Sequence, residues 1–199
     1  MSGSIAALFS EPSRGARLIY LMGPSGSGKD TLIQALKARH HEVLVAHRYI
    51  TRPWRAGNEN HVELSPQEFA QRQTLGLFLM SWEAHGRDYG IGCEVEAWLA
   101  AGHPVLVNGS RGHLEEAQLR FGPTLLPVLL RVDEAVLRAR LETRGRESPA
   151  EIEERLARAR EYGNGISDKA VVIDNNGPVE QAVEVLERLL EAPELSLDG

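Results

Sequence analysis

The sequence predicts an α/β fold with a buried parallel sheet at its core and helices on both faces of that sheet. Three observations predict it. Short apolar runs alternate with amphipathic stretches, and a glycine-rich loop joins the first run to the first amphipathic stretch. With 199 residues, 42% hydrophobic and 25% charged, the chain also has the size and composition of one globular domain.

The apolar runs and the stretches between them place the elements in order. Strands are expected at Leu18–Met22, Glu42–Val45, Pro104–Asn108, Leu125–Arg131 and Ala170–Ile173. Helices are expected at Lys29–Arg39, Cys93–Ala101 and Pro178–Leu190, and after two Ser-Pro-x-Glu openings at Ser65 and Ser148. Each opening combines a capping box with a proline in the first helical turn, which is typical of a helix start.

Two segments interrupt the alternation of strand and helix. Residues 47–92 are too long for a simple crossover, so we expect an insertion there, and residues 138–160 are rich in arginine, as in a lid. The expected organisation is a single domain at 17–191, with an N-terminal tail at 1–16 and a C-terminal tail at 192–199.

The charge balance excludes several classes of partner. Lys and Arg total 22 against 28 for Asp and Glu, giving a net charge of −6 and a pI near 5.7. Such a chain is a poor candidate for general binding to nucleic acid or to anionic membranes. The one cysteine, Cys93, cannot form an internal disulfide, and no apolar run approaches the roughly 18 residues of a membrane helix. We expect a cytoplasmic protein; the sequence leaves its oligomeric state open.

The strongest chemical signal is the glycine-rich loop between Leu18–Met22 and the helix that begins at Lys29. Its glycines let successive backbone N–H groups point at phosphate oxygens, and the helix N-terminus adds a positive dipole end. Lys29 supplies an ammonium group for the β and γ phosphates. We therefore predict a P-loop NTPase whose ATP site comprises Gly23, Pro24, Ser25, Gly26, Ser27, Gly28, Lys29, Asp30 and Thr31.

Asp30 departs from the usual loop, which has Ser or Thr after the lysine to bind Mg²⁺. A carboxylate is a good hard ligand for Mg²⁺, so we predict Asp30 as the metal-binding residue, directly or through water. The alternative is that Asp30 only complements the helix dipole. The strand ending at Asn108 offers no acid as a second ligand, which favours the metal role.

The 47–92 segment carries candidates for binding a second anion. Arg52 and Arg55 are spaced to converge on one phosphate if the turn between them is tight, and an arginine fork matches phosphate geometry. His61 and Tyr89 could add neutral donors. The alternative is an irregular surface loop in which each histidine merely satisfies a local hydrogen bond.

The arginine-rich segment at 138–160 has two interpretations as well. Its arginines either bind anions or lie on a solvated helix face, paired with glutamates four residues away. The second interpretation predicts ion pairs of Glu142 with Arg138 and of Glu151 with Arg155.

The order of these motifs resembles the guanylate kinase superfamily over about residues 17–190. Within it, four stretches are similar to the ribose 1,5-bisphosphate phosphokinase family: Gly28–Asp30, His47–Arg52, Glu59–His61 and Val107–Arg111. This resemblance implies transfer of the γ-phosphoryl group of MgATP to the 1-phosphate of ribose 1,5-bisphosphate, in phosphonate catabolism. It also implies catalytic roles for Lys29, Arg52, Arg55, Arg144 and Arg155.

Departures from guanylate kinase concern the guanine-reading positions. By alignment on Tyr89-Gly90, the glutamate, serine and aspartate of a guanine reader fall at Met80, Arg48 and near Gly109. A methionine cannot accept the guanine N–H bonds, and each buried unmatched donor costs about 1–3 kcal/mol. The resemblance therefore implies a sugar bisphosphate acceptor, with Arg48, Arg52, Arg55, His61 and Tyr89 binding it. Guanylate kinase, another small-molecule P-loop kinase and a non-catalytic guanylate-kinase-like interaction module remain alternatives.

Overall fold

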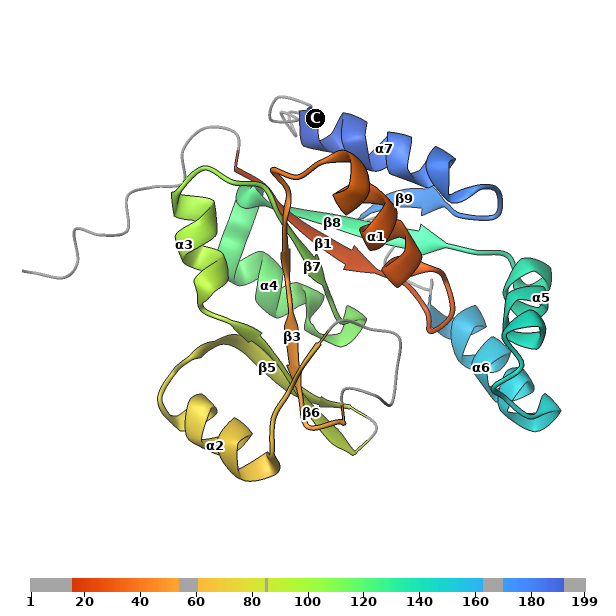
Figure 1. Cartoon of the computed structure of the whole chain (residues 1–199), viewed down its shortest axis with the longest axis horizontal. Coiled ribbons are helices and arrows are strands. Elements are labelled where there is room, and N and C mark those ends of the chain that lie inside the picture. Colours follow the sequence, from red (N-terminus) through yellow and green to blue (C-terminus); the bar gives the residue numbers. More distant parts are fainter. Residues whose placement is uncertain (1–15, 54–60, 85, 163–169, 192–199) are drawn as a thin grey trace, which may run out of the picture. The chain divides into compact units, whose positions relative to one another are not determined.

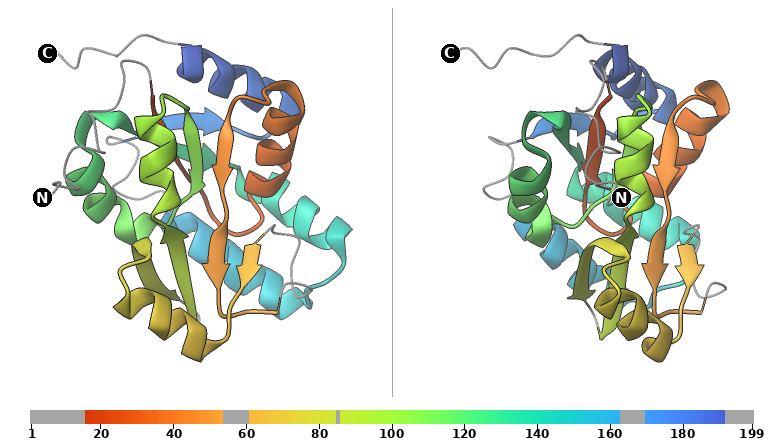
Figure 2. Two further views of the ribbon diagram at one scale, coloured as in Figure 1. Left: turned by 60° about the vertical axis from the view of Figure 1, so that its left-hand side comes forward. Right: turned by 90° about the vertical axis from the view of Figure 1, so that its left-hand side faces the viewer.

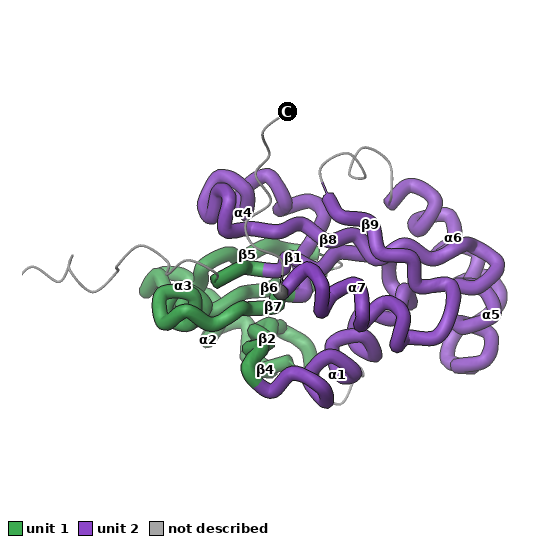
Figure 3. The backbone as a smooth tube through the Cα atoms, turned by 90° about the horizontal axis from the view of Figure 1, so that it is seen from above, with its two compact units in different colours: residues 1–18, 42–107, 193–199 green, residues 19–41, 108–192 purple. Residues whose placement is uncertain are grey.

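The computed structural model describes residues 16–53, 61–84, 86–162 and 170–191, and the chain divides into two compact units (Figure 3). Unit 1 comprises residues 1–18, 42–107 and 193–199, and unit 2 comprises residues 19–41 and 108–192. The expected insertion at 47–92 therefore lies within unit 1 and the arginine-rich segment at 138–160 within unit 2.

A five-stranded parallel sheet with the strand order β2-β7-β1-β8-β9 confirms the expected fold class (Figure 1). Every residue of β1 and β7 is buried, as expected for strands covered on both faces. The bounds match the expected strands to within two residues: β1 (Leu18–Met22), β2 (Leu44–Ala46), β7 (Val105–Asn108), β8 (Leu125–Arg131) and β9 (Val171–Asp174).

The helices of unit 2 lie on both faces of its strands. The helices α1 and α7 pack against each other on one face, and α4 packs against β8 on the other (Figure 2). Their bounds are α1 (Lys29–Arg39), α4 (Leu114–Phe121), α5 (Glu134–Arg144), α6 (Pro149–Tyr162) and α7 (Val179–Glu191), with 3₁₀ turns at Arg111–His113 and Gly122–Thr124. No helix among the described residues is long and apolar enough to cross a membrane.

A helical hairpin, formed by α5 and α6, contains most of the arginine-rich segment. Its interior is apolar, and two ion pairs cross its surface: Arg138 Nη1 lies 2.5 Å from Glu153 Oε1, and Arg160 Nε donates to Glu134 Oε2 at 2.6 Å. The expected pairing of Arg138 with Glu142 is wrong, because Arg138 reaches the facing helix instead. These arginine contacts lower the pKa of both glutamates.

Unit 1 contains a second sheet with the strand order β4-β3-β6-β5. The helix α2 (Pro66–Thr74) lies on one side of it, where the ring of Phe78 packs 4.5 Å from Phe69 and 5.6 Å from Tyr49. Ser65 Oγ accepts from Glu68 N at 3.1 Å, which confirms the predicted cap. The remaining bounds are β3 (Arg48–Ile50), β4 (His61–Glu63), β5 (Phe78–Ala84), β6 (Arg87–Gly92) and α3 (Glu94–Ala100).

Candidate phosphoryl-transfer site

The glycine-rich loop of unit 2 adopts a conformation that requires glycine. Gly26 and Gly28 have φ angles of 89° and 94°, in the left-handed region that other residues rarely adopt. Lys29 Nζ donates to the carbonyls of Gly23 at 2.6 Å and Pro24 at 3.0 Å, so its side chain folds back along the loop. The ammonium group therefore lies at the loop, as the sequence predicts for a phosphate-binding lysine.

Asn175 supports the phosphate loop through a hydrogen bond that the sequence motifs did not reveal. Asn175, 3% exposed, donates from Nδ2 to the carbonyl of Ser27 at 2.7 Å. Arg140 Nη2 in turn donates to the Asn175 carbonyl at 2.7 Å. Asn175 follows directly after β9, at the carboxyl edge of the parallel sheet where ligand sites of α/β folds gather, and that position was the signal available in the sequence.

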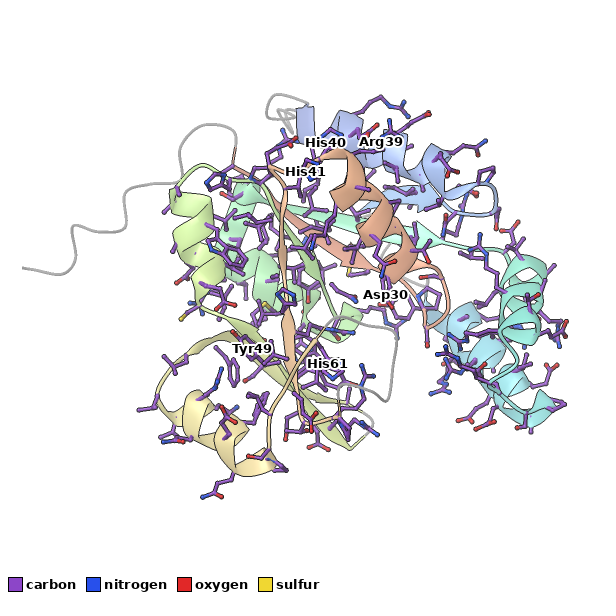
Figure 4. The ribbon with its side chains drawn as sticks, viewed as in Figure 1. Asp30, Arg39, His40, His41, Tyr49 and His61 are labelled. Atoms are coloured by element: carbon purple, nitrogen blue, oxygen red, sulfur yellow. The ribbon has the colours of Figure 1, made fainter. Side chains whose placement is uncertain are left out.

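The edge of the sheet beside the loop carries oxygen donors that suit Mg²⁺. Asp30 lies in the first turn of α1 (Figure 4). Asn108 ends β7, the neighbour of β1, and its Oδ1 is buried with no hydrogen-bond partner among the described residues. Gly109 N donates to the Leu21 carbonyl at 2.9 Å, so Asn108 is level with the end of β1, where the loop begins.

The Asp30 carboxylate and the Asn108 amide oxygen fit a magnesium ion whose other ligands are water and phosphate oxygens. The described residues contain no group of three or more His, Cys, Asp or Glu side chains that could hold a metal by themselves. Mg²⁺ in kinase sites takes only one or two protein oxygens and completes its shell with phosphates and water. One carboxylate and one amide oxygen are therefore compatible with it.

Two arginines from the helical hairpin meet at one acid, and one of them reaches the phosphate loop. Arg155 Nη1 donates to Ser25 Oγ at 2.7 Å, and its Nη2 lies 3.2 Å from Glu147 Oε1. Arg144 Nη2 donates to that same Glu147 oxygen. The expected ion pair of Arg155 with Glu151 is wrong: Glu151 instead accepts from Ser148 N and Oγ, both at 2.8 Å.

A further residue of the Val107–Arg111 stretch fastens the end of the hairpin. Arg111 Nη1 donates to the carbonyls of Glu161 at 2.6 Å and Tyr162 at 3.0 Å, and its guanidinium lies over the Tyr162 ring. Tyr162 Oη accepts from Gly23 N at 3.3 Å. The end of α6 is thereby tied to the start of the loop.

Unit 1 brings together three of its predicted acceptor residues on one face of its sheet. The strand register gives the row His61–Arg48–Ile91–Met80, and Tyr89 stands on the same face in the next row, because alternate residues of a strand share a face. Arg48 Cζ lies 5.3 Å from the centre of the Tyr89 ring. In Figure 4, Tyr49 lies on the α2 side of the sheet and His61 on the other.

Arg52 joins this group through the histidine. Arg52 Nη2 donates to His61 Nδ1 at 3.4 Å, and His61 Nε2 donates to the Arg52 carbonyl at 3.0 Å, so the imidazole, 8% exposed, fixes the arginine. Arg55, its predicted companion, lies outside the described residues.

Trp82 and Arg87 extend the same face and were missed by the sequence motifs. The Trp82 ring stacks on Tyr89 at 5.6 Å with 6° between the planes. Arg87 lies two residues before Tyr89 in β6, so both side chains share one face of the sheet. Arg87 Nη1 is buried and has no hydrogen-bond partner among the described residues. The period-two spacing of Arg87 from Tyr89 was the sequence signal for it.

Comparisons with known proteins identify the family of this chain. A family model described as an AAA domain matches residues 19–161. A ribose 1,5-bisphosphate phosphokinase of Pantoea vagans is 56% identical over 177 residues, covering 88% of this chain and 98% of that protein. The chain belongs to the ribose 1,5-bisphosphate phosphokinase family, and its core is an AAA domain.

A further sequence relative and a solved structure extend these findings. The relative of that name from Yersinia pestis is 51% identical over 88% of this chain and 91% of its own length. A guanylate kinase structure from Anaplasma phagocytophilum matches with a TM-score of 0.73 at 18% identity, covering 93% of this chain and 89% of that one. This chain therefore has the guanylate kinase fold, as the motif order predicted.

Proposed function

We propose that this chain transfers the γ-phosphoryl group of MgATP to the 1-phosphate of ribose 1,5-bisphosphate, giving ADP and 5-phosphoribosyl 1-diphosphate. The names of its relatives support this reaction. We also propose that this reaction serves phosphonate catabolism and takes place in the cytoplasm, where ATP is available.

The observation that carries the acceptor assignment is the filling of the positions where a guanine reader needs acids. Met80 is 4% exposed in the row with Arg48 and offers no oxygen to accept a hydrogen bond. A Cβ added to Gly109 would lie 2.3 Å from a Tyr20 ring carbon, so no side chain fits there. The Tyr20 hydroxyl is itself held, donating to the Ser110 carbonyl at 3.0 Å. This chemistry favours an acceptor without a guanine base.

Two phosphates of the acceptor would instead meet cations. We assign the reacting 1-phosphate to Arg52, Arg55, His61 and Tyr89, and the 5-phosphate to Arg48. Arg87 shares the face of Tyr89, and its buried Nη1 has no hydrogen-bond partner among the described residues, so an anion there would be favourable. We therefore add Arg87 to the residues that bind the reacting phosphate.

The reaction needs no general base, because a phosphate monoester with a second pKa of about 6 is largely a dianion at pH 7. The difficulty is to bring two polyanions in line and to stabilise the spread negative charge. Lys29 would exchange its two loop carbonyls for β- and γ-phosphate oxygens. Arg144 and Arg155 would bind the transferring group, and closure of the hairpin over the site would exclude water.

Magnesium would be held by Asp30 and, through water, by Asn108. It neutralises charge on the β and γ phosphates when bound. The oxygens of both residues suit the ion. Without the ion, the Asp30 carboxylate would repel the triphosphate.

A coupled ADP-release assay with ribose 1,5-bisphosphate, GMP and ribose 5-phosphate in parallel tests the assignment. Two lost base contacts at about 1.4 kcal/mol each predict kcat/KM for ribose 1,5-bisphosphate at least about a hundredfold above that for GMP. Ribose 5-phosphate lacks the reacting phosphate and should give only background ADP. Comparable efficiency with GMP would restore guanylate kinase as the better assignment.

A further inference from the structure

The acid that joins the two hairpin arginines has no role in the mechanism described so far. Glu147 lies in the short connection between α5 and α6, and its side chain is 7% exposed. One oxygen, Oε1, contacts both Arg144 and Arg155, while Oε2 is buried with no hydrogen-bond partner among the described residues. The carboxylate therefore serves the two arginines and little else.

An acid is an unfavourable neighbour for a triphosphate site. Arg155 reaches Ser25 of the phosphate loop at 2.7 Å, so Glu147 is only one side chain away from the place where the nucleotide phosphates bind. Its charge opposes theirs, and removing a carboxylate from water carries a further desolvation cost. A residue with these two costs must provide a compensating benefit.

The benefit lies in the arginine pair. Two guanidinium groups repel each other when brought together, and each long side chain loses rotamer freedom on being fixed. An anion between them offsets the repulsion, and its shared oxygen sets their separation before any phosphate arrives. Since Arg155 also holds Ser25, the pair is fixed relative to the loop and not only within the hairpin.

We propose that Glu147 is a positioning residue for phosphoryl transfer, which holds Arg144 and Arg155 together at the phosphate loop in readiness for the γ-phosphate. This inference rests on the proposed kinase function. It predicts that the charge of Glu147 weakens ATP binding and speeds the transfer step, so that ATP affinity and turnover move in opposite senses when the charge is removed.

The test is Glu147→Gln, which keeps the size of the side chain and removes its charge. We expect the Kd for MgATP, measured by calorimetry without acceptor, to fall about twofold or more, and kcat to fall about tenfold or more. Glu147→Asp keeps the charge and should restore most of kcat. The matched control is Glu153→Gln, which removes one charge from the same hairpin, where Glu153 contacts Arg138, and should leave both quantities near the wild type.

The results separate the inference from the proposed function. An unchanged kcat for Glu147→Gln, or a Kd that rises together with a loss of kcat, would overturn the positioning role, as would equal effects of Glu153→Gln. A wild-type enzyme that fails on ribose 1,5-bisphosphate refutes the acceptor instead, and the MgATP Kd still tests the charge effect. Thermal unfolding shows whether Glu147→Gln is folded, and Glu147→Asp decides the outcome if it is not.

Discussion

Gly28→Ala should damage the phosphate loop in two distinct ways. At a φ of +94°, an alanine pays about 1–2 kcal/mol for the left-handed backbone. Its Cβ would also lie 2.7 Å from Asn175 Nδ2, which must then leave the Ser27 carbonyl. An unpaired buried carbonyl costs about 1–3 kcal/mol. The sum is about 2–5 kcal/mol.

The matched control is Gly76→Ala. Gly76 also has a positive φ, of 68°, but no atom lies within 4 Å of an added Cβ. This variant is therefore destabilised only by the strain of the left-handed backbone. At about 2–4 °C per kcal/mol for a chain of this size, the extra lowering of Tm in Gly28→Ala should be about 2–12 °C.

Differential scanning calorimetry measures both variants, and a fluorescent ATP analogue reports affinity. We expect Gly28→Ala to lose at least about tenfold in ATP affinity, worth about 1.4 kcal/mol, and Gly76→Ala to bind normally. Equal Tm shifts for the two variants, or wild-type affinity in Gly28→Ala, would show that the Asn175 contact does not shape the loop.

Four further predictions concern the phosphate loop, the proposed acceptor residues and the helical hairpin. Lys29→Ala should lower kcat at least about a hundredfold while the far-ultraviolet circular dichroism stays unchanged, and turnover within tenfold of wild type would contradict the loop assignment. Asp30→Asn should raise the magnesium concentration needed for half-maximal rate; an unchanged titration would leave only the helix-dipole role. Arg87→Ala should raise KM for ribose 1,5-bisphosphate about tenfold or more with KM for ATP unchanged, since a charged hydrogen bond is worth about 1.5–3 kcal/mol. Because arginine partners lower the folded-state pKa of Glu134 and Glu153, their stabilisation is present above the unfolded pKa of about 4.3 and is lost as the pH falls through the folded pKa. Thermal unfolding of Glu134→Gln should therefore depend less on pH below 5 than that of the wild type.

The elements that follow from local chemistry were predictable from the sequence. The phosphate loop depends on consecutive residues and backbone angles, so Gly26, Gly28 and Lys29 could be read directly, and α1 begins and ends where its pattern predicts. The helix caps at Ser65 and Ser148 depend on residues three apart, and both serine hydroxyls accept from the expected backbone N–H.

Contacts across long sequence separations could not be predicted in this way. Asn175 donates to the Ser27 carbonyl across a sequence separation of 148 residues. Arg138 pairs with Glu153 and not with Glu142, because helix packing brings α6 within reach. The predicted acceptor residues Arg48 and Tyr89 share one face of the unit 1 sheet, but their role in binding stays a prediction. Arg87 was missed because its place on the Tyr89 face depends on the course of β6, which the motifs do not encode.

The helix α1 connects the phosphate loop to the opposite end of unit 2. Its 11 residues make a stiff rod of about 16 Å, with Lys29 at one end and Arg39 at the other. At the far end, Arg39 Nε and His40 Nε2 lie 2.8 and 2.9 Å from Glu187 Oε1 on α7 (Figure 4). We expect a displacement of the loop on nucleotide binding to move α1 and, through the Glu187 contacts, α7. Amide hydrogen exchange in α7 should then change when ATP binds, and Glu187→Ala should abolish that change while ATP still binds.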